Sequence, residues 1–132
     1  MKIAVIVARV LLGVVFVFAG FTKVVPVIPM QPMPGDMGAM LTLMMTHKWI
    51  LFYGVVELGS GLLLLAGRFV PLALTLLAAL LTNILLFNVT LAPSAGTVAA
   101  TLVLGALEIF LVWAYRESFA GVLSAKAQPK LA

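Results

Sequence analysis

The chain has 132 residues, of which 64% are hydrophobic and 9% charged, and its formal net charge is +4. Soluble domains carry about 25% charged residues, so a chain this short and this apolar is excluded from the class of water-soluble proteins. The absence of cysteine and the presence of one histidine, His47, exclude disulfides, thiol catalysis, iron–sulfur clusters and bis-histidine haem.

Four apolar blocks follow one another along the chain, at about 3–25, 49–66, 69–91 and 96–115. A membrane-spanning helix takes about 20 apolar residues, so each block is long enough to cross the bilayer once. Gly67 and Pro71 mark a tight turn between the second and third blocks, and residues 92–96 form a second short turn. The sequence therefore predicts an all-α fold, an integral membrane four-helix bundle with up-down-up-down topology, as a single domain over residues 1–132.

Residues 26–48 form the long connection of the bundle, an outer loop that contains one short helix. Its first half cannot be helical because it contains four prolines, at positions 26, 29, 32 and 34. Asp36 is predicted to cap a helix that runs to His47, and Met30 and Met33 are expected to precede that helix.

Methionines dominate this connection, and Met37, Met40 and Met44 recur at the spacing of a helix. One interpretation is a Cu(I) site made of soft thioether sulfurs, together with His47. The other is a short amphipathic helix that lies on the membrane or caps the bundle. The second interpretation is favoured, so no metal site is predicted.

The basic residues predict the orientation of the bundle in a cell membrane. Five of them fall on one side and two, Lys23 and Lys48, on the other; the five are Lys2, Arg68, Arg116, Lys126 and Lys130. The side richer in Lys and Arg is the cytoplasmic one, so both termini and the polar tail at 116–132 are expected in the cytoplasm. Because this placement accounts for the positive charge, no nucleic-acid partner is predicted.

Three ionisable residues, Arg9, Glu57 and Glu108, lie inside the predicted spans. Helix rise places them roughly 9–15 Å from the cytoplasmic helix ends, and small residues flank each of them on its own helical face. We therefore predict that Arg9 pairs with Glu57, with Glu108 or with both. Because two carboxylates would face one guanidinium, either one carboxyl stays protonated or Lys23, Tyr53 or Tyr115 supplies hydrogen bonds.

This set of polar residues has two interpretations that the sequence leaves open. A buried ion pair can fix how the helices pack, or it can form a proton-linked or anion-binding pocket. Asn83 in the third span likewise either bridges two helices by hydrogen bonds or contacts a polar group of a ligand, such as a quinone carbonyl. Asn88 and Thr90 form a glycosylation triplet, which is dismissed because it lies at the edge of the bilayer.

The segments "ARVLLGVVFVFAGFTKV" and "GVVELGSGLLLLAGRFVPLALTLLAALLTNILLFN" resemble the DoxX-like family of small four-helix membrane proteins. The resemblance covers nearly the whole chain and includes Glu57 with Gly61, Gly67 with Arg68 and Pro71, and Asn83 with Phe87. It implies that Arg9, Lys23, Glu57 and Asn83 are the family's functional positions.

The resemblance also implies a link to redox chemistry, because the family is named for a subunit of a thiosulfate:quinone oxidoreductase. The function expected from it is a quinone- or lipid-associated subunit of a membrane oxidoreductase complex, with a quinone as its cofactor. No catalytic residue is predicted, and no catalytic activity is expected of the chain alone. Its expected partners are the lipid bilayer, an oxidoreductase subunit and further copies of the chain. The alternative is a non-catalytic membrane assembly or scaffold protein, as distant relatives are.

Overall fold

The computed structural model describes residues 1–25, 33–91 and 94–130, and these contain helices and no strand. The helices are α1 (Lys2–Val24), α2 (Gly35–Thr46), α3 (Trp49–Ala66), α4 (Val70–Thr90) and α5 (Ala95–Ala114), followed by a short 3-10 turn, Arg116–Phe119. All but α2 are long and apolar enough to cross a membrane. Their ends lie within one residue of the bounds predicted from the sequence, and together they form the predicted all-α membrane bundle.

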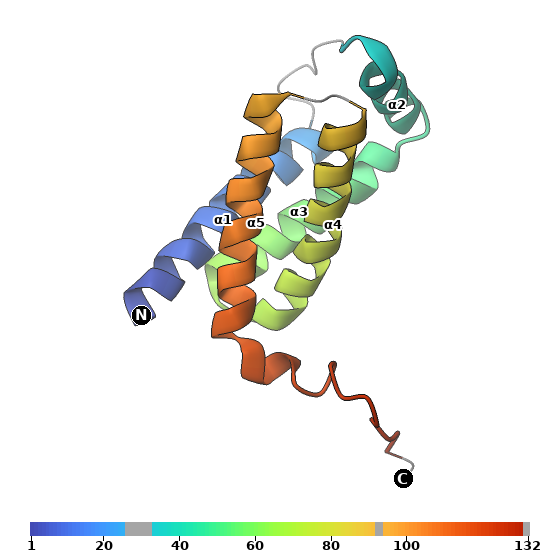
Figure 1. The fold of residues 1–132 in the computed structure, drawn as a ribbon. Coiled ribbons are helices and arrows are strands. Elements are labelled where there is room, and N and C mark those ends of the chain that lie inside the picture. Colours follow the sequence, from blue (N-terminus) through green and yellow to red (C-terminus); the bar gives the residue numbers. More distant parts are fainter. Residues whose placement is uncertain (26–32, 92–93, 131–132) are drawn as a thin grey trace.

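The bundle consists of two helix pairs that pack against each other (Figure 1). One pair is α1 with α3, and the other is α4 with α5, which stand side by side. The two termini and the α3–α4 turn lie at the same end of the bundle, and α2 lies across the opposite end. The bundle therefore has two distinct ends, one that carries the termini and one that is covered by α2.

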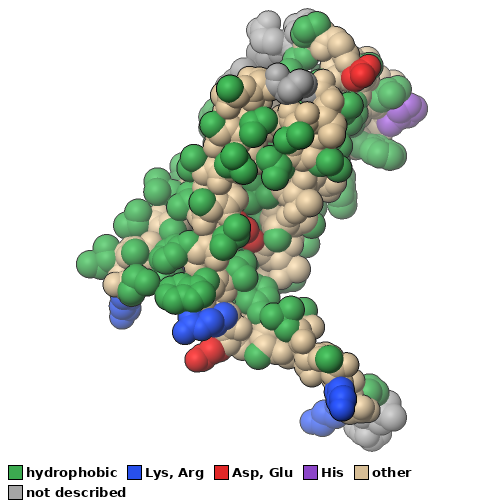
Figure 2. Space-filling model, in the orientation of Figure 1, with side chains coloured by type: hydrophobic (Ala, Val, Ile, Leu, Met, Phe, Trp, Pro, Cys, Tyr) green, Lys and Arg blue, Asp and Glu red, His purple; other side chains and the backbone are tan. Residues whose placement is uncertain are grey.

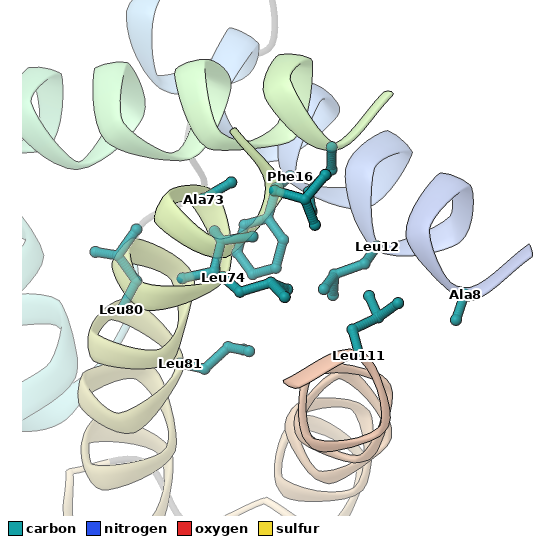
Figure 3. Packing of buried hydrophobic residues seen from close by; sticks show 11 residues of the cluster. Ala8, Leu12, Phe16, Ala73, Leu74, Leu80, Leu81 and Leu111 are labelled. Atoms are coloured by element: carbon teal, nitrogen blue, oxygen red, sulfur yellow. The ribbon is translucent and has the colours of Figure 1, made fainter. Parts of the chain in front are cut away.

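The apolar core fills the space where the two pairs meet (Figure 3). Leu12 and Phe16 of α1 point toward Leu74 of α4 and Leu111 of α5, and each of the four is almost fully buried. The core residues recur at steps of three and four along α1 and α4, the spacing that puts them on one face of a helix. Because α4 contributes most of the core, it anchors the second pair to the first.

Glycines bring the backbones of α1 and α3 into direct contact. A Cβ atom added to Gly20 would lie 2.6 Å from the carbonyl oxygen of Gly54, and one added to Gly61 would lie 2.8 Å from that of Gly13. Real Cβ atoms do not approach backbone so closely, so no larger residue fits at Gly20 or Gly61 without a backbone shift. Gly13 and Gly20 are seven residues apart on α1, as are Gly54 and Gly61 on α3. We call these four residues the glycine seam.

The outer surface of the bundle is apolar, as a lipid-facing surface must be. Figure 2 shows hydrophobic side chains over the middle of the molecule, with the blue basic side chains gathered at the end that carries the termini. Exposed Leu, Val, Ile and Phe residues occur on all four long helices. This distribution matches a band of hydrocarbon between two polar interfaces.

The α3–α4 turn agrees with the prediction from the sequence, whereas the start of α2 differs from it. Gly67 ends α3 in the left-handed conformation with φ 70°, and Pro71 lies in the first turn of α4, as predicted. Asp36, by contrast, does not cap α2: the N-cap is Pro34, and Asp36 lies in the first turn, where its charge favours the helix dipole. Met33 precedes α2 as expected, whereas Met30 and the prolines at 26, 29 and 32 lie outside the described residues.

Candidate functional site

An ion pair joins the two helices of the glycine seam. The Nζ atom of Lys23, in the last turn of α1, lies 2.6 Å from Oε2 of Glu57 in the middle of α3. The Glu57 side chain is 2% exposed and that of Lys23 is 24% exposed, so the carboxylate is buried and the ammonium reaches it from the rim. The close approach of Gly54 to the Cβ atom of Lys23 puts the long lysine side chain beside α3.

The prediction that Arg9 pairs with Glu57 or Glu108 is wrong. Among the described residues the one ion pair is that of Lys23 with Glu57. Arg9 instead lies at the end of the bundle that carries the termini, beside Tyr115 and Gly67. Its Nη1 atom donates a hydrogen bond to the Tyr115 hydroxyl at 3.4 Å. Its guanidinium also packs on the α3–α4 turn, 3.2 Å from where a Cβ of Gly67 would lie. Arg9 therefore fastens α1 to α5 and the turn.

A cavity of about 220 Å³ opens beside the Lys23–Glu57 pair, beneath α2. We call it the α2 cavity. Four helices supply its walls: Lys23 from α1, Met37, Met40 and Met44 from α2, Tyr53 and Glu57 from α3, and Phe87 and Asn88 from α4. Its lining is largely apolar with a few polar side chains from α1, α3 and α4, which is the usual composition of a small-molecule site.

Asn88 in the wall of the α2 cavity also joins α4 to α5 by a hydrogen bond. The Asn88 side chain donates to the Thr101 hydroxyl at 2.9 Å, and that hydroxyl donates to the Thr97 carbonyl oxygen at 2.8 Å. Helix bridging was one of the two roles predicted for Asn83, but Asn88 makes such a bond, and the sequence had singled out Asn88 only as part of a glycosylation triplet. Asn83 is exposed on the outside of α4 and makes no side-chain hydrogen bond within the described part of the chain.

Glu108 lies apart from the α2 cavity, in a second hollow between α4 and α5. This α4–α5 groove has a volume of about 370 Å³ and opens on the outer surface, and Gly105, Ile109 and Leu85 line it beside Glu108. Glu108 is 5% exposed, and neither of its carboxyl oxygens has a hydrogen-bond partner among the described residues. The five predicted site residues are thus distributed over four places: the α2 cavity holds Lys23 and Glu57, and Arg9, Asn83 and Glu108 are separate.

The methionines of α2 form the lid of the α2 cavity. Met37 and Met44 are buried against the bundle, so α2 caps one end of it. His47 is exposed and follows the helix as its C-cap residue. In the described ranges, no group of three His, Cys, Asp or Glu side chains is close enough together to hold a metal ion.

Sequence reasoning missed Phe87 and Asn88 as parts of a site, and it named Tyr53 only as one candidate hydrogen-bond donor to the buried carboxylates. The signal that was present is their spacing: Ile84, Phe87 and Asn88 lie at steps of three and one on the same face of α4 as the core residues Leu77 and Leu81. A polar residue on the core face of a membrane helix requires a partner inside the protein, which points to Asn88 and away from Asn83.

Comparison with known proteins adds a family to this geometry. The family model named DoxX matches residues 4–92, which include α1 from its third residue onward, all of α2, α3 and α4, and every residue named as a wall of the α2 cavity. Neither the curated proteins nor the solved structures include a significant match to the chain. Because the family model covers more than half of the chain, including both members of its ion pair, the chain belongs to the DoxX family.

Proposed function

We propose that the protein is a quinone-binding subunit of a membrane oxidoreductase complex and that the α2 cavity holds the quinone ring. The observation that carries this proposal is the α2 cavity, lined by polar side chains from α1, α3 and α4 and by methionines from α2. Its volume of about 220 Å³ suits one or two fused six-membered rings. The redox link itself rests on the resemblance to the family of a thiosulfate:quinone oxidoreductase subunit.

The donors that remain in the cavity suit a ring carbonyl. Lys23 uses one of its three ammonium protons on Glu57, and Asn88 uses one of its two amide protons on Thr101. The Tyr53 hydroxyl is a further donor in the wall. Because Phe87 and the α2 methionines surround these donors, a flat apolar ring can fill the cavity while its oxygen accepts their hydrogen bonds.

Catalysis is assigned to the partner subunit, since the cavity contains no thiol and no metal-binding cluster among its described walls. The role of this chain is to bind and orient the ring. An apolar tail of the ligand would extend into the lipid alongside the helices. We propose the cell membrane as the location, with both termini in the cytoplasm.

Tryptophan fluorescence tests the binding proposal. The two tryptophans lie at opposite ends of the bundle, Trp49 next to α2 and Trp113 near the termini. In vesicles that contain the Trp113→Phe variant, a short-chain naphthoquinone is expected to quench Trp49 in a saturable way. Tyr53→Phe and Asn88→Leu are expected to weaken that saturable binding about 3- to 10-fold each, because each removes one hydrogen bond.

A matched control distinguishes the cavity from general partition into lipid. Asn83→Leu removes an amide from the same helix outside the cavity, so it is expected to leave the quenching curve unchanged. Quenching that rises linearly with quinone and is the same in all variants would refute the proposal.

A scaffold or assembly role is the second candidate, and the observation that favours it is the ion pair beside the glycine seam. In that case Lys23 and Glu57 act only by holding α1 to α3. Because apolar side chains of similar volume can replace a buried ion pair at little cost, Lys23→Met combined with Glu57→Leu should then preserve complex assembly. Native mass spectrometry of the complex should find no quinone. A bound quinone that is lost in this double variant, while the complex persists, supports the first candidate.

Reporter fusions test the proposed orientation. Lys2, Arg68 and Arg116 lie at one end of the bundle, which supports the cytoplasmic placement of that end. A fusion after Ala132 is expected to give a cytoplasmic signal, and a fusion within residues 31–38 an external one. A cytoplasmic signal from the second fusion would reverse the proposed orientation.

A further inference from the structure

Asn83 is a polar side chain on the lipid-facing side of a membrane helix. It lies seven residues before the end of α4, about 10 Å from that end, and therefore within the hydrocarbon region of a bilayer about 30 Å thick. Its side chain is exposed and has no hydrogen-bond partner in the described part of the chain. An amide in hydrocarbon without partners is unfavourable, because lipid tails supply neither donors nor acceptors.

The other exposed polar side chains of α4 do not share this problem. The hydroxyls of Thr75, Thr82 and Thr90 each donate to the carbonyl oxygen four residues earlier, at 2.9, 2.8 and 2.7 Å. A hydroxyl can be satisfied by its own helix in this way. Asn83 therefore stands out on α4 as a side chain whose hydrogen-bonding groups require a partner from outside the chain.

The residues around Asn83 form a regular seam along the exposed side of α4. Steps of four and three residues connect its members, which are all exposed: Leu72, Leu76, Ala79, Asn83, Leu86 and Thr90. We call them the α4 seam. This spacing is that of the contact positions in a coiled coil, and it is separate from the buried face of the same helix, where Leu77 and Leu81 lie.

We propose that a second copy of this chain docks on the α4 seam, so that two α4 helices pack in parallel and their Asn83 side chains hydrogen-bond to each other. Copies in one membrane share an orientation, and a two-fold axis along the membrane normal makes their α4 helices parallel. An asparagine amide is self-complementary because it has both a donor and an acceptor. A single asparagine at such a position is also the device that fixes register and two-stranded pairing in parallel coiled coils.

A small residue next to Asn83 on the seam allows the close approach that this pairing needs. Ala79 lies one turn before it on the seam, and both flanking leucines, Leu76 and Leu86, are exposed. Packing of small and branched side chains, together with hydrogen bonds between helices, drives helix association in membranes. The α4 seam therefore matches the α4 helix of a second copy both in shape and in hydrogen bonding.

Cysteine scanning along α4 tests the proposal directly, because the natural chain contains no cysteine. In native membranes under mild oxidant, Ala79→Cys and Leu86→Cys on the seam are expected to form disulfide-linked dimers efficiently. The matched controls Val55→Cys and Leu62→Cys are also exposed but lie on α3, outside the seam. These two are expected to form at least 10-fold less dimer, since thiols that point apart cannot be bridged.

The role of the amide is tested in the same assay. Asn83→Leu added to Ala79→Cys is expected to weaken dimerisation about 3- to 30-fold, the usual effect of a hydrogen bond between membrane helices. Thermal unfolding in detergent checks that Asn83→Leu still folds, and Asn83→Gln, which keeps the amide, is expected to restore much of the dimer. Equal crosslinking at all four positions, no dimer, crosslinks to a different protein, or insensitivity to Asn83→Leu would each overturn the proposal.

Discussion

The ammonium of Lys23 lies 2.6 Å from the carboxylate of Glu57, between α1 and α3 and beside the α2 cavity. One contact therefore serves both the packing of the tightest helix pair and the proposed site. The buried carboxylate depends on the lysine, because neither water nor lipid replaces a lost cation at a side chain that is 2% exposed.

Removing only the lysine of this pair is expected to destabilise the bundle more than neutralising both of its members. Lys23→Met leaves a buried carboxylate unpaired, which costs up to about 3–5 kcal/mol of unfolding free energy. Adding Glu57→Gln removes the unpaired charge, so the double variant should be more stable than Lys23→Met alone. A double-mutant cycle on thermal unfolding in detergent measures the coupling, with Lys126→Met in the exposed tail as the control. Strictly additive effects would contradict the pairing.

A methyl group at Gly20 is expected to push α1 and α3 apart. Gly20→Ala would put a Cβ against the backbone nitrogen of Leu58 and the carbonyl oxygen of Gly54, at a cost of about 1–3 kcal/mol or more. Gly59→Ala is the matched control, since a Cβ there meets nothing within 4 Å. It should be neutral or slightly stabilising, because alanine favours the helix by up to about 1 kcal/mol. Equal effects of the two substitutions on thermal unfolding would argue against the glycine seam.

Arg9 is expected to couple to Tyr115 and not to Glu57. Tyr115→Phe removes the hydroxyl that accepts from Arg9 and should cost about 0.5–1.5 kcal/mol of unfolding free energy. In an Arg9→Met background the same change should cost less. The cycle of Arg9→Met with Glu57→Gln should be additive, since the two residues do not touch. Coupling in this second cycle would restore the pairing that the structure contradicts.

The two asparagines of α4 are expected to behave in opposite ways when each is changed to leucine. Asn88→Leu breaks the bond to Thr101 and should lower the unfolding free energy by about 0.5–1.5 kcal/mol. Asn83→Leu places an apolar side chain on an exposed apolar surface and should not destabilise the monomer in detergent. Denaturation of both variants at low protein concentration makes the comparison, and the reverse order would mean that the assignments of the two amides are exchanged.

The methionines of α2 are expected to act by shape and not by metal binding. Changing Met37, Met40 and Met44 together to leucine keeps the side chains apolar and similar in volume, so each change should cost less than about 1.5 kcal/mol. Growth of cells in added copper should be unaffected by the triple change. A specific loss of copper tolerance, with folding and membrane insertion intact, would support a Cu(I) site instead.

The helices were predictable because their information is local. Apolar length, Gly67 and Pro71 determine where the spans begin and end, and the structure has those ends within one residue of the prediction. The site was only partly predictable, because depth along a helix says nothing of rotation about it. Arg9, Glu57 and Glu108 have similar estimated depths but face different neighbours, and Lys23 reaches inward from a helix end that was counted as an outer charge.

The two asparagines of α4 also show that depth along a helix does not determine which neighbour a side chain faces. Asn83 looked more deeply placed than Asn88, but the face of α4 that meets α5 is set by packing across the whole bundle. Only that packing decides which amide finds Thr101. Helical phase relative to the core residues could have separated them, whereas position along the span could not.

The close pairing of α1 with α3, rather than with a helix adjacent in sequence, has a consequence for biosynthesis. When α1 enters the membrane, the helix that matches its glycines and its lysine has not yet been made. At ~5–20 residues per second the ribosome needs on the order of seconds to complete α3, so α1 must wait in the lipid or beside an insertion factor. Nascent chains that stop before Ala66 should therefore be more susceptible to membrane proteases than chains that extend past it.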